Sequence, residues 1–516
     1  MTEGSSTGGS PPAPGAGTAR GARLAGAPAP ELVSAAHAEE AAQAVALAHA
    51  LSLADLAHAV ALAECGAIDA ETAAALLGGL LDLHAIPPEE FPWDPARGDA
   101  FNNRESELRE RIGAPAGWLT AGRPRREAFR VALRLVARDG LLGVHAAELD
   151  LASALADQAE RHAADLAADY TYLQPAQPTT VGHLLLAHAE PVLRDAERLR
   201  RAHAWLDRSP AGAGGSAGSR WPLDRARLAE LLGLAGVAVH TRDAMWAADG
   251  YAELIADLAL ALTHVSQLAQ DLEILASREF GVVELDEAHS RQSDLMPQKK
   301  NPYALAVLRA AAGSAAGDLA GVLTTLHTGS ARTDHFHLLN GLVPALLERA
   351  RTAEALAAAV VAGMAIDAER AAEAARAGFV VAADVADVLA AEAGIDYRSA
   401  HTVVGRATRR LVAEGRDPAT LTADDLAAAA ETAIGHAVQI DPAALADALD
   451  PAACLRRRPQ AGSAAPREMA AMLEAARAEI DGARAWASAV AERALSAEAA
   501  LLDRAAELAG RPPLDG

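Results

Sequence analysis

The sequence predicts an all-α protein organised around a bundle of long helices. Apolar residues make up 51% of its 516 residues but aromatic residues only 3%, and alanine supplies much of the apolar total. Small residues with high helix propensity favour packed helices over a sheet core. The clearest periodicity runs from Leu254 to Leu275, where leucine and valine recur in steps of three and four, as on the packed face of a helix. We find no convincing strand-like alternation.

The N-terminal part is expected to hold a disordered extension and then a helical domain. Residues 1–30 are rich in Gly, Pro, Ser and Ala and lack the apolar core of a signal peptide, which predicts a disordered extension. Helical spacing runs from Glu31 to about Leu83, and a short charged helix is expected over 102–112. The Pro-rich stretch 84–99 connects them. The predicted N-terminal helical domain is therefore 31–128.

The central region, 129–364, is predicted as the helix bundle. A long helix should start near Pro124, which suits an early helical position, and continue to about Ala168, with Gly140 and Gly143 as its weak points. The stretch 171–178 interrupts the helical pattern, and a second long helix is expected over 181–206. A glycine-rich loop, 209–219, follows.

Two further helices are expected after the Leu254–Leu275 segment, over 303–326 and 342–364. From about Ala365 the helical patterns are shorter and broken by turns. Residues 365–516 are therefore predicted as a C-terminal helical domain.

Charge and composition exclude some classes of function. A net charge of −23 argues against a nucleic-acid partner, and no apolar run approaches the ~18 residues of a membrane span. To bind an anionic substrate, the protein would need a local cluster of Arg and Lys that reverses its overall negative electrostatic field. The two cysteines, Cys65 and Cys454, have no metal-binding spacing and are expected to be free thiols. We expect a cytoplasmic protein.

One loop, 290–302, stands apart from the helical patterns. Two prolines, Pro297 and Pro302, bracket it, so it is not helical throughout. Ser293 precedes the charge of Lys299 by six positions and the amide of Asn301 by eight. Such a loop suits binding of a carboxylate beside a hydroxyl that acts on a neighbouring C–H bond. A surface connection between helices is the alternative.

The run Ser293-Asp-Leu-Met-Pro-Gln-Lys-Lys-Asn-Pro302 resembles the signature of the fumarase/aspartase superfamily, Gly-Ser-x-x-Met-Pro-x-Lys-x-Asn. It is most similar to the argininosuccinate lyase branch, although Gln292 replaces the family glycine. Similar stretches occur elsewhere along the chain, covering most of it from about Glu31: Gly122-Arg-x-Arg125, Thr171–Pro178, Gly212–Arg225, Ala382–Asp387 and Tyr397–His401.

The resemblance implies a three-domain, mostly helical fold with a central long-helix bundle. It also implies a homotetramer whose active sites each combine segments of three subunits, and no cofactor or metal. The reaction would be elimination across a succinyl C–N bond with release of fumarate.

The resemblance implies a role for each matching residue. Ser293 would be the base that removes the proton, activated by Lys299 and backbone amides. Arg125, Lys299 and Asn301 would bind the carboxylate on which negative charge develops, and Thr171 would add a hydroxyl donor. The alternative for Arg125 is a solvated side chain in the Arg123/Arg125/Arg126 cluster.

The chain departs from the family on the leaving-group side. Tyr172 stands where the family has a histidine, and Ala306 where it has the paired glutamate. Amines leave poorly without a general acid, whereas nitrite leaves unprotonated. In this respect the sequence resembles the nitrosuccinate lyases of natural-product pathways, which are relatives of argininosuccinate lyase, and this resemblance implies nitrosuccinate as the substrate, in natural-product biosynthesis. Tyr172 acting as the acid would instead preserve an amine leaving group. The family's Asn-Asp pair after Arg125 is also changed, to Arg126-Glu127.

Other interpretations remain open. Argininosuccinate is the alternative substrate, an adenylosuccinate-type substrate fits the signature less well, and a structural, non-catalytic protein on the same fold is a third possibility. His335 and His337 with Asp334 suggest a weak metal-binding hypothesis if they lie on an extended strand. Arg332 is a candidate for binding the leaving group or the second carboxylate.

Overall fold

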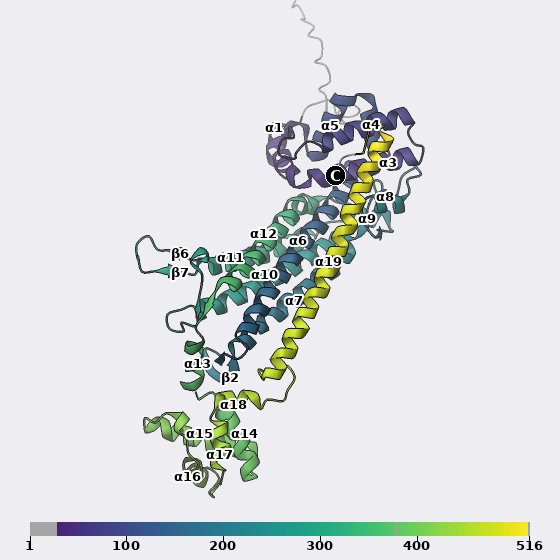
Figure 1. Cartoon of the computed structure of the whole chain (residues 1–516). Coiled ribbons are helices and arrows are strands. Elements are labelled where there is room, and N and C mark those ends of the chain that lie inside the picture. Colours follow the sequence, from purple (N-terminus) through teal and green to yellow (C-terminus); the bar gives the residue numbers. More distant parts are fainter. Residues whose placement is uncertain (1–27, 378, 514–516) are drawn as a thin grey trace, which may run out of the picture.

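The protein is a long helical bundle with a helical cap at one end and a small helical domain at the other (Figure 1). The computed structural model describes residues 28–377 and 379–513. Residues 1–27, most of the expected disordered extension 1–30, lie outside the described residues. The predicted all-α class is confirmed, since the strands form only four short two-stranded pairs among the described residues.

The cap is built by the N-terminal helices. They are α1 (Pro30–Leu32), the π-helical η1 (Val33–His37), α2 (Ala38–Ala42), α3 (Ala44–Glu64), α4 (Ala70–His84), η2 (Pro95–Arg97), α5 (Ala100–Ile112) and η3 (Ala114–Thr120). Aspartates accept backbone hydrogen bonds at three of their N-termini, Asp69 from Thr72, Asp94 from Ala96 and Asp99 from Asn102, and so satisfy amides that a helix leaves without partners. Helix α3 is buried on nearly all sides.

The bundle consists of six long helices with short ones at its cap end. The long helices are α6 (Arg125–Arg161), α7 (Val181–Leu206), α10 (Asp249–Leu275), α11 (Tyr303–Thr325), α12 (Asp334–Gly363) and α19 (Pro466–Leu508); the short ones are α8 (Arg225–Leu231) and α9 (Thr241–Trp246). Gly140 does not interrupt α6. A Cβ there would lie 2.8 Å from Leu347 Cδ1, so the glycine lets α6 and α12 pack closely.

Short strands complete the bundle's loops. The pairs are β1 (Leu166–Thr171) with β2 (Gln174–Thr180), β3 (Arg208–Ser209) with β4 (Gly236–Val237), β5 (Val283–Glu284) with β8 (Ala365–Ile366), and β6 (Arg291–Gln292) with β7 (Lys300–Asn301); η4 is Glu287–His289. All are antiparallel except β3–β4. The long helix expected to reach Ala168 thus ends at Arg161, because the β-forming Leu166–Thr171 segment pairs with a strand containing Pro175 and Pro178.

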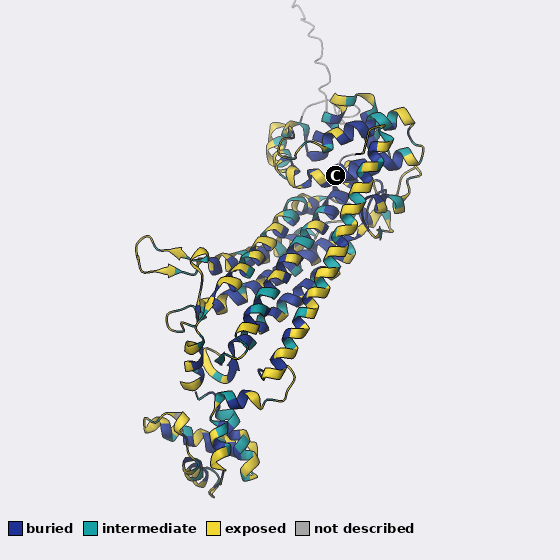
Figure 2. Cartoon of the chain, viewed as in Figure 1, coloured by how far each residue is buried: buried dark blue, intermediate teal, exposed yellow. Residues whose placement is uncertain are grey.

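The small domain has its own core and lies at the far end of the bundle (Figure 2). Its elements are α13 (Ala368–Ala377), α14 (Ala382–Ala393), α15 (Tyr397–Ala413), η5 (Pro418–Thr420), α16 (Ala423–Ile434), α17 (Pro442–Ala448) and α18 (Pro451–Arg456). The predicted C-terminal unit 365–516 therefore needs correction. Helix α19 leaves this domain and packs along α6, α7, α3 and α4, where Leu473, Ile480 and Leu501 join the bundle core.

Two helices are long and apolar enough to cross a membrane, by length and composition alone: α3 and α11. In α3, 83% of the apolar window is buried inside the protein, as expected for a core helix. In α11 only 28% of the window is buried, so this helix presents an apolar face to the outside.

Candidate active site

The predicted site residues lie in three separate places within one chain. Arg125 is the first residue of α6, at the cap end of the bundle. Thr171 and Tyr172 lie at the β1–β2 turn, beyond the other end of α6. Ser293, Lys299 and Asn301 belong to the β6–β7 hairpin, which projects from the bundle (Figure 1). With 37 residues, α6 spans about 55 Å at ~1.5 Å per residue, so one chain does not bring Arg125 to the hairpins.

Arg125 opens onto a cavity of about 190 Å³. Its Nη1 donates to Asp99 Oδ2 at 2.7 Å, while 46% of the side chain stays exposed. The lining also includes Glu40, Gln43, Arg126, Arg130, Thr333, His337 and Asn340. Burial, and next the Asp99 carboxylate, raise the pKa of Glu40, and His337 Nδ1 lies 3.3 Å from its carboxylate. The guanidinium is thus oriented by Asp99 and remains open on one side.

Two helix N-termini flank this cavity. Helices α6 and α12 run in the same direction. Near their N-termini Arg130 stacks on Phe336, and near their C-termini Gln158 Nε2 donates to the Val361 carbonyl at 2.8 Å. Helix N-termini carry partial positive charge and unpaired amide donors. Together with Arg125 and Arg126, they favour binding of an anion such as a carboxylate.

Glu127 is a residue of this region whose position the sequence did not reveal. It is buried, and its two carboxylate oxygens accept from the backbone amides of Gly212 (2.7 Å) and Gly214 (2.6 Å). Burial raises its pKa to about 7. Glu127 therefore anchors the glycine-rich loop beside the start of α6. The only sign of this contact in the sequence is a carboxylate and, far along the chain, a glycine-rich loop with free backbone amides.

Two segments singled out in the sequence meet here. Gly122 has φ of 72°, and a Cβ at this position would contact Ser219 and lie 2.9 Å from Trp221 Cδ1. Trp118 packs edge-on against Trp221, with ring centroids 5.8 Å apart. The Gly122–Arg125 segment and the Gly212–Arg225 loop, distant in sequence, thus form one surface next to the cavity.

The β1–β2 turn holds Tyr172 in a strained conformation. Thr171 pairs with Gln174, and the two residues between them, Tyr172 and Leu173, both have positive φ, 53° and 56°. Side chains other than glycine adopt this left-handed region at a cost, and such strain is concentrated at functional sites. The Tyr172 side chain is 100% exposed. No other part of its own chain therefore covers this side chain.

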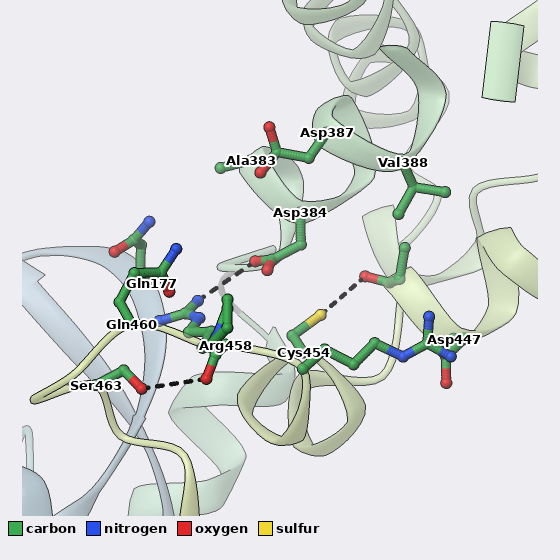
Figure 3. Close-up of a pocket in the computed structure, with 13 residues that line it drawn as sticks. Gln177, Ala383, Asp384, Asp387, Val388, Asp447, Cys454, Arg458, Gln460 and Ser463 are labelled. Carbon is green, nitrogen blue, oxygen red and sulfur yellow. Dashed lines mark hydrogen bonds and ion pairs between the residues drawn. The ribbon is translucent and has the colours of Figure 1, made fainter. Parts of the chain in front are cut away.

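The other face of this hairpin joins the small domain around a second cavity, of about 490 Å³ (Figure 3). Gln177 from β2 and Asp384 from α14 both line it, and Arg458 links them by donating to the Pro178 carbonyl at 3.2 Å and pairing with Asp384 at 3.5 Å. Cys454 Sγ donates to the Ala448 carbonyl, and burial raises its pKa to about 12. Two of the family-like segments therefore meet at a domain junction.

The β6–β7 hairpin carries the signature residues in an ordered but exposed arrangement. Ser293 Oγ accepts from the Met296 amide at 3.0 Å, and the Ser293 amide donates to the Lys299 carbonyl at 3.2 Å. Asn301 Nδ2 donates to the Arg291 carbonyl at 3.0 Å. Ser293 is half-buried and Lys299 is exposed. These hydrogen bonds fix the backbone of the loop, whereas its side chains are open to solvent on the side away from the loop.

The remaining candidates are also placed. Ala306 is exposed on the first turns of α11, and Arg332 is exposed just before α12. His335 and His337 lie on α12 rather than on an extended strand, because that helix starts at Asp334, earlier than expected. Two residues apart on a helix, they face different ways: His335 is buried and His337 is exposed. The hypothesis that these two histidines bind a metal ion from an extended strand is therefore wrong.

Comparison with known proteins agrees with this architecture. A family model described as lyase matches residues 26–317, and one described as argininosuccinate lyase C-terminal matches 379–456. An argininosuccinate lyase of Methanoculleus marisnigri is 36% identical, covering 82% of this chain and 85% of its own length. One of Thermus thermophilus is 35% identical, covering 80% and 89%. The crystal structure of EDDS lyase in complex with formate is 29% identical with TM-score 0.83, covering 94% and 97%.

Proposed function

Since this chain belongs to the argininosuccinate lyase branch of the fumarase/aspartase superfamily and is a carbon–nitrogen lyase, we propose that it eliminates nitrite from a nitrosuccinate-type substrate and releases fumarate. The observation that carries the choice of substrate is the exposed tyrosine, Tyr172, at the turn where the family places an imidazole. Its expected partner position holds Ala306, whose methyl group cannot hold or relay a proton.

The missing pair matters because of what must leave. In the elimination, the base takes a proton from the carbon next to one carboxylate, a C=C bond forms, and the C–N electron pair departs with nitrogen. An amine or guanidine leaves well only when a general acid protonates it. Nitrite, the conjugate base of a fairly strong acid, departs with the electron pair unprotonated.

The first half of the reaction needs cations near the carboxylate. Negative charge builds up there as the proton is removed, and fixed positive groups stabilise it without rearranging. Arg125, oriented by Asp99 at 2.7 Å beside two helix N-termini, suits this role. Lys299 and Asn301 supply a second charge and an amide from the signature hairpin, and Thr171 adds a hydroxyl.

Ser293 is proposed as the base. A serine hydroxyl is a weak base unless nearby donors or cations stabilise its deprotonated form. Within the hairpin, the Met296 amide donates to its Oγ at 3.0 Å, and Lys299 lies across the same loop. Exclusion of water would strengthen both interactions.

The site requires several copies of the chain, and we propose a homotetramer around α11. This helix exposes Tyr303, Val307 and Leu323. Gly313, Gly317 and Gly321 follow one another at spacings of four, and a Cβ at any of them would meet no atom within 4 Å. Apolar side chains beside small residues favour close packing of helices. Such packing would bring the exposed hairpins of one copy to the Arg125 cavity of another.

Argininosuccinate is the second candidate substrate. It is favoured by the relatives, which are argininosuccinate lyases 35–36% identical over about four fifths of this chain. If it is the substrate, Tyr172 must supply the proton, since a phenol is a competent acid. The Tyr172→Phe variant then separates the two candidates.

The test offers purified protein nitrosuccinate, argininosuccinate and EDDS separately and follows fumarate by its ultraviolet absorbance. EDDS is included because EDDS lyase shares the fold over most of the chain. The proposal expects the highest kcat/KM on nitrosuccinate and little change in Tyr172→Phe. Faster fumarate release from argininosuccinate, with a large loss in Tyr172→Phe, would overturn the substrate assignment and leave the reaction class intact.

A further inference from the structure

A cluster of metal-binding side chains lies at the cap end of the molecule, outside the candidate active site. It consists of His49 on α3, His84 at the end of α4 and Glu498 on α19. Their ligand atoms all lie within 4.8 Å of one another, and among the described residues this is the group of three His, Cys, Asp or Glu side chains that meets this condition. His49 and His84 come from consecutive helices, whereas Glu498 comes from a helix hundreds of residues later in the sequence.

One distance in the cluster fits a tetrahedral metal centre. His49 Nε2 lies 3.1 Å from Glu498 Oε1, whereas ligand atoms about 2.0–2.1 Å from zinc are separated by about 3.3 Å in a tetrahedron. The ligand atoms lie up to 4.8 Å apart, so binding an ion would require rotation of these exposed and half-buried side chains. Two histidines and one glutamate are a common ligand set for zinc, with a water in the fourth position.

A second observation concerns the orientation of His84. Its Nδ1 lies 3.0 Å from Oγ of Ser52, which is buried on α3. Metal-bound histidines almost always donate their other ring N–H to an oxygen, which sets the tautomer and the ring orientation. With Ser52 as the acceptor, Nδ1 would carry the proton, which leaves the Nε2 lone pair available to a metal ion.

Two arginines act electrostatically on the cluster. Arg104 shares the buried Asp55 carboxylate with Arg123, and Arg138 pairs with Asp139 at 2.7 Å. The groups that a divalent ion would meet directly are one carboxylate and two imidazoles. The His49 side chain is 57% exposed, which leaves a path from solvent.

We propose that His49, His84 and Glu498 bind a borderline divalent cation of the zinc and cobalt class, which ties the C-terminal end of α19 to α3 and α4. Helix α19 runs the length of the bundle and reaches the cap only there (Figure 1). The cluster shares no residue with the lining of the Arg125 cavity or with either hairpin, and the role that we propose for it is structural. Imidazole and carboxylate ligands favour Zn²⁺ and Co²⁺ over Mg²⁺ and Ca²⁺, which prefer oxygen.

The test uses untagged full-length protein stripped with a chelator and dialysed against Zn²⁺ or Co²⁺. We expect one ion per chain by elemental analysis, visible absorption typical of tetrahedral Co²⁺, and a Tm that rises with Zn²⁺ concentration. Mg²⁺ at the same concentration should leave Tm unchanged.

Variants assign the ion to these residues. His84→Gln and Glu498→Gln should each lose the bound ion, and Ser52→Ala, which removes only the orienting hydroxyl, should weaken affinity about 10–100-fold. The matched control is His188→Gln, because His188 Nε2 lies 3.2 Å from Asp271 with no third ligand. Full binding in His84→Gln and Glu498→Gln, or loss in His188→Gln, would overturn the proposal. So would the absence of stoichiometric Zn²⁺ or Co²⁺ in the parent protein.

Discussion

The two ends of the predicted active site differ in how far a single chain completes them. At the cap end, Arg125 is oriented by Asp99 at 2.7 Å, and Glu127 binds the neighbouring glycine-rich loop through two amides. At the other end, Tyr172 is fully exposed on a strained turn, and Ser293 and Lys299 sit on a projecting hairpin. The cap end is preformed within one chain. At the other end the backbone is ordered, but no other part of the chain covers the predicted site residues.

This difference separates two tasks. Binding a carboxylate needs fixed charges and dipoles, and one chain positions them by packing α6 against α12. Proton transfer needs a site closed to water, and in the proposed assembly the exposed hairpins would obtain such an environment against another copy. Variants at the two ends should therefore fail in different ways.

The largest effect is expected at the exposed hairpin. Ser293→Ala removes the proposed base, and fumarate release should fall about 10²–10⁴-fold, mainly in kcat. The fold and the assembly should be unchanged, since the side chain makes one local hydrogen bond, from the Met296 amide. Ser290→Ala is the control, because its hydroxyl donates to the Asp286 carbonyl in the same loop. Full turnover by Ser293→Ala would exclude it as the base.

Breaking the assembly should come next. Gly317→Arg puts a large charged side chain on the exposed face of α11, where a Cβ meets no atom of its own chain within 4 Å. The chain should still fold, the oligomer should dissociate, and activity should fall about 100-fold because the site loses its alignment. Light scattering and fumarate release measure the two effects. Gly405→Arg, at an equally open helical glycine in the small domain, should change neither.

A smaller loss is expected at the preformed end. Arg125→Gln keeps a donor but removes the charge, and kcat/KM should fall roughly 10–100-fold, since a lost charged hydrogen bond costs about 1.5–3 kcal/mol. Arg109→Gln, on an exposed arginine of α5, provides the matched control. Equal kinetics for both variants would show that Arg125 is a solvated side chain.

The last effect concerns stability, not catalysis, at the preformed end. Burial raises the pKa of Glu127 to about 7 from 4.5, so the folded state binds more protons than the unfolded state between these values. The free energy of unfolding should therefore decrease as pH rises from 4.5 to 7, by up to about 1.4 kcal/mol per unit, and then level off. Glu127→Gln should flatten Tm in this window relative to the exposed-residue variant Glu479→Gln. Parallel curves would contradict the role of Glu127.

Much of the fold was predictable because it follows from local pattern. The Leu254–Leu275 periodicity lies within α10, and the Pro-bracketed stretch 290–302 contains the β6–β7 hairpin. The return of α19 to the bundle was not predictable, since its partners on α3, α4, α6 and α7 are hundreds of residues away. The same reason hid the His49–His84–Glu498 cluster and the contact between Glu127 and Gly212, which depend on packing rather than spacing.

The most direct test of the account mixes two impaired proteins. Ser293→Ala and Arg125→Ala chains are dissociated together in equal amounts and reassembled. If each site takes Arg125 from one copy and Ser293 from another, on the order of a quarter of the sites should contain both intact residues, since each comes from the intact type with a chance of one half. Fumarate release should then return to about that fraction of the parent rate. No recovery in correctly sized mixed oligomers would contradict a site shared between copies.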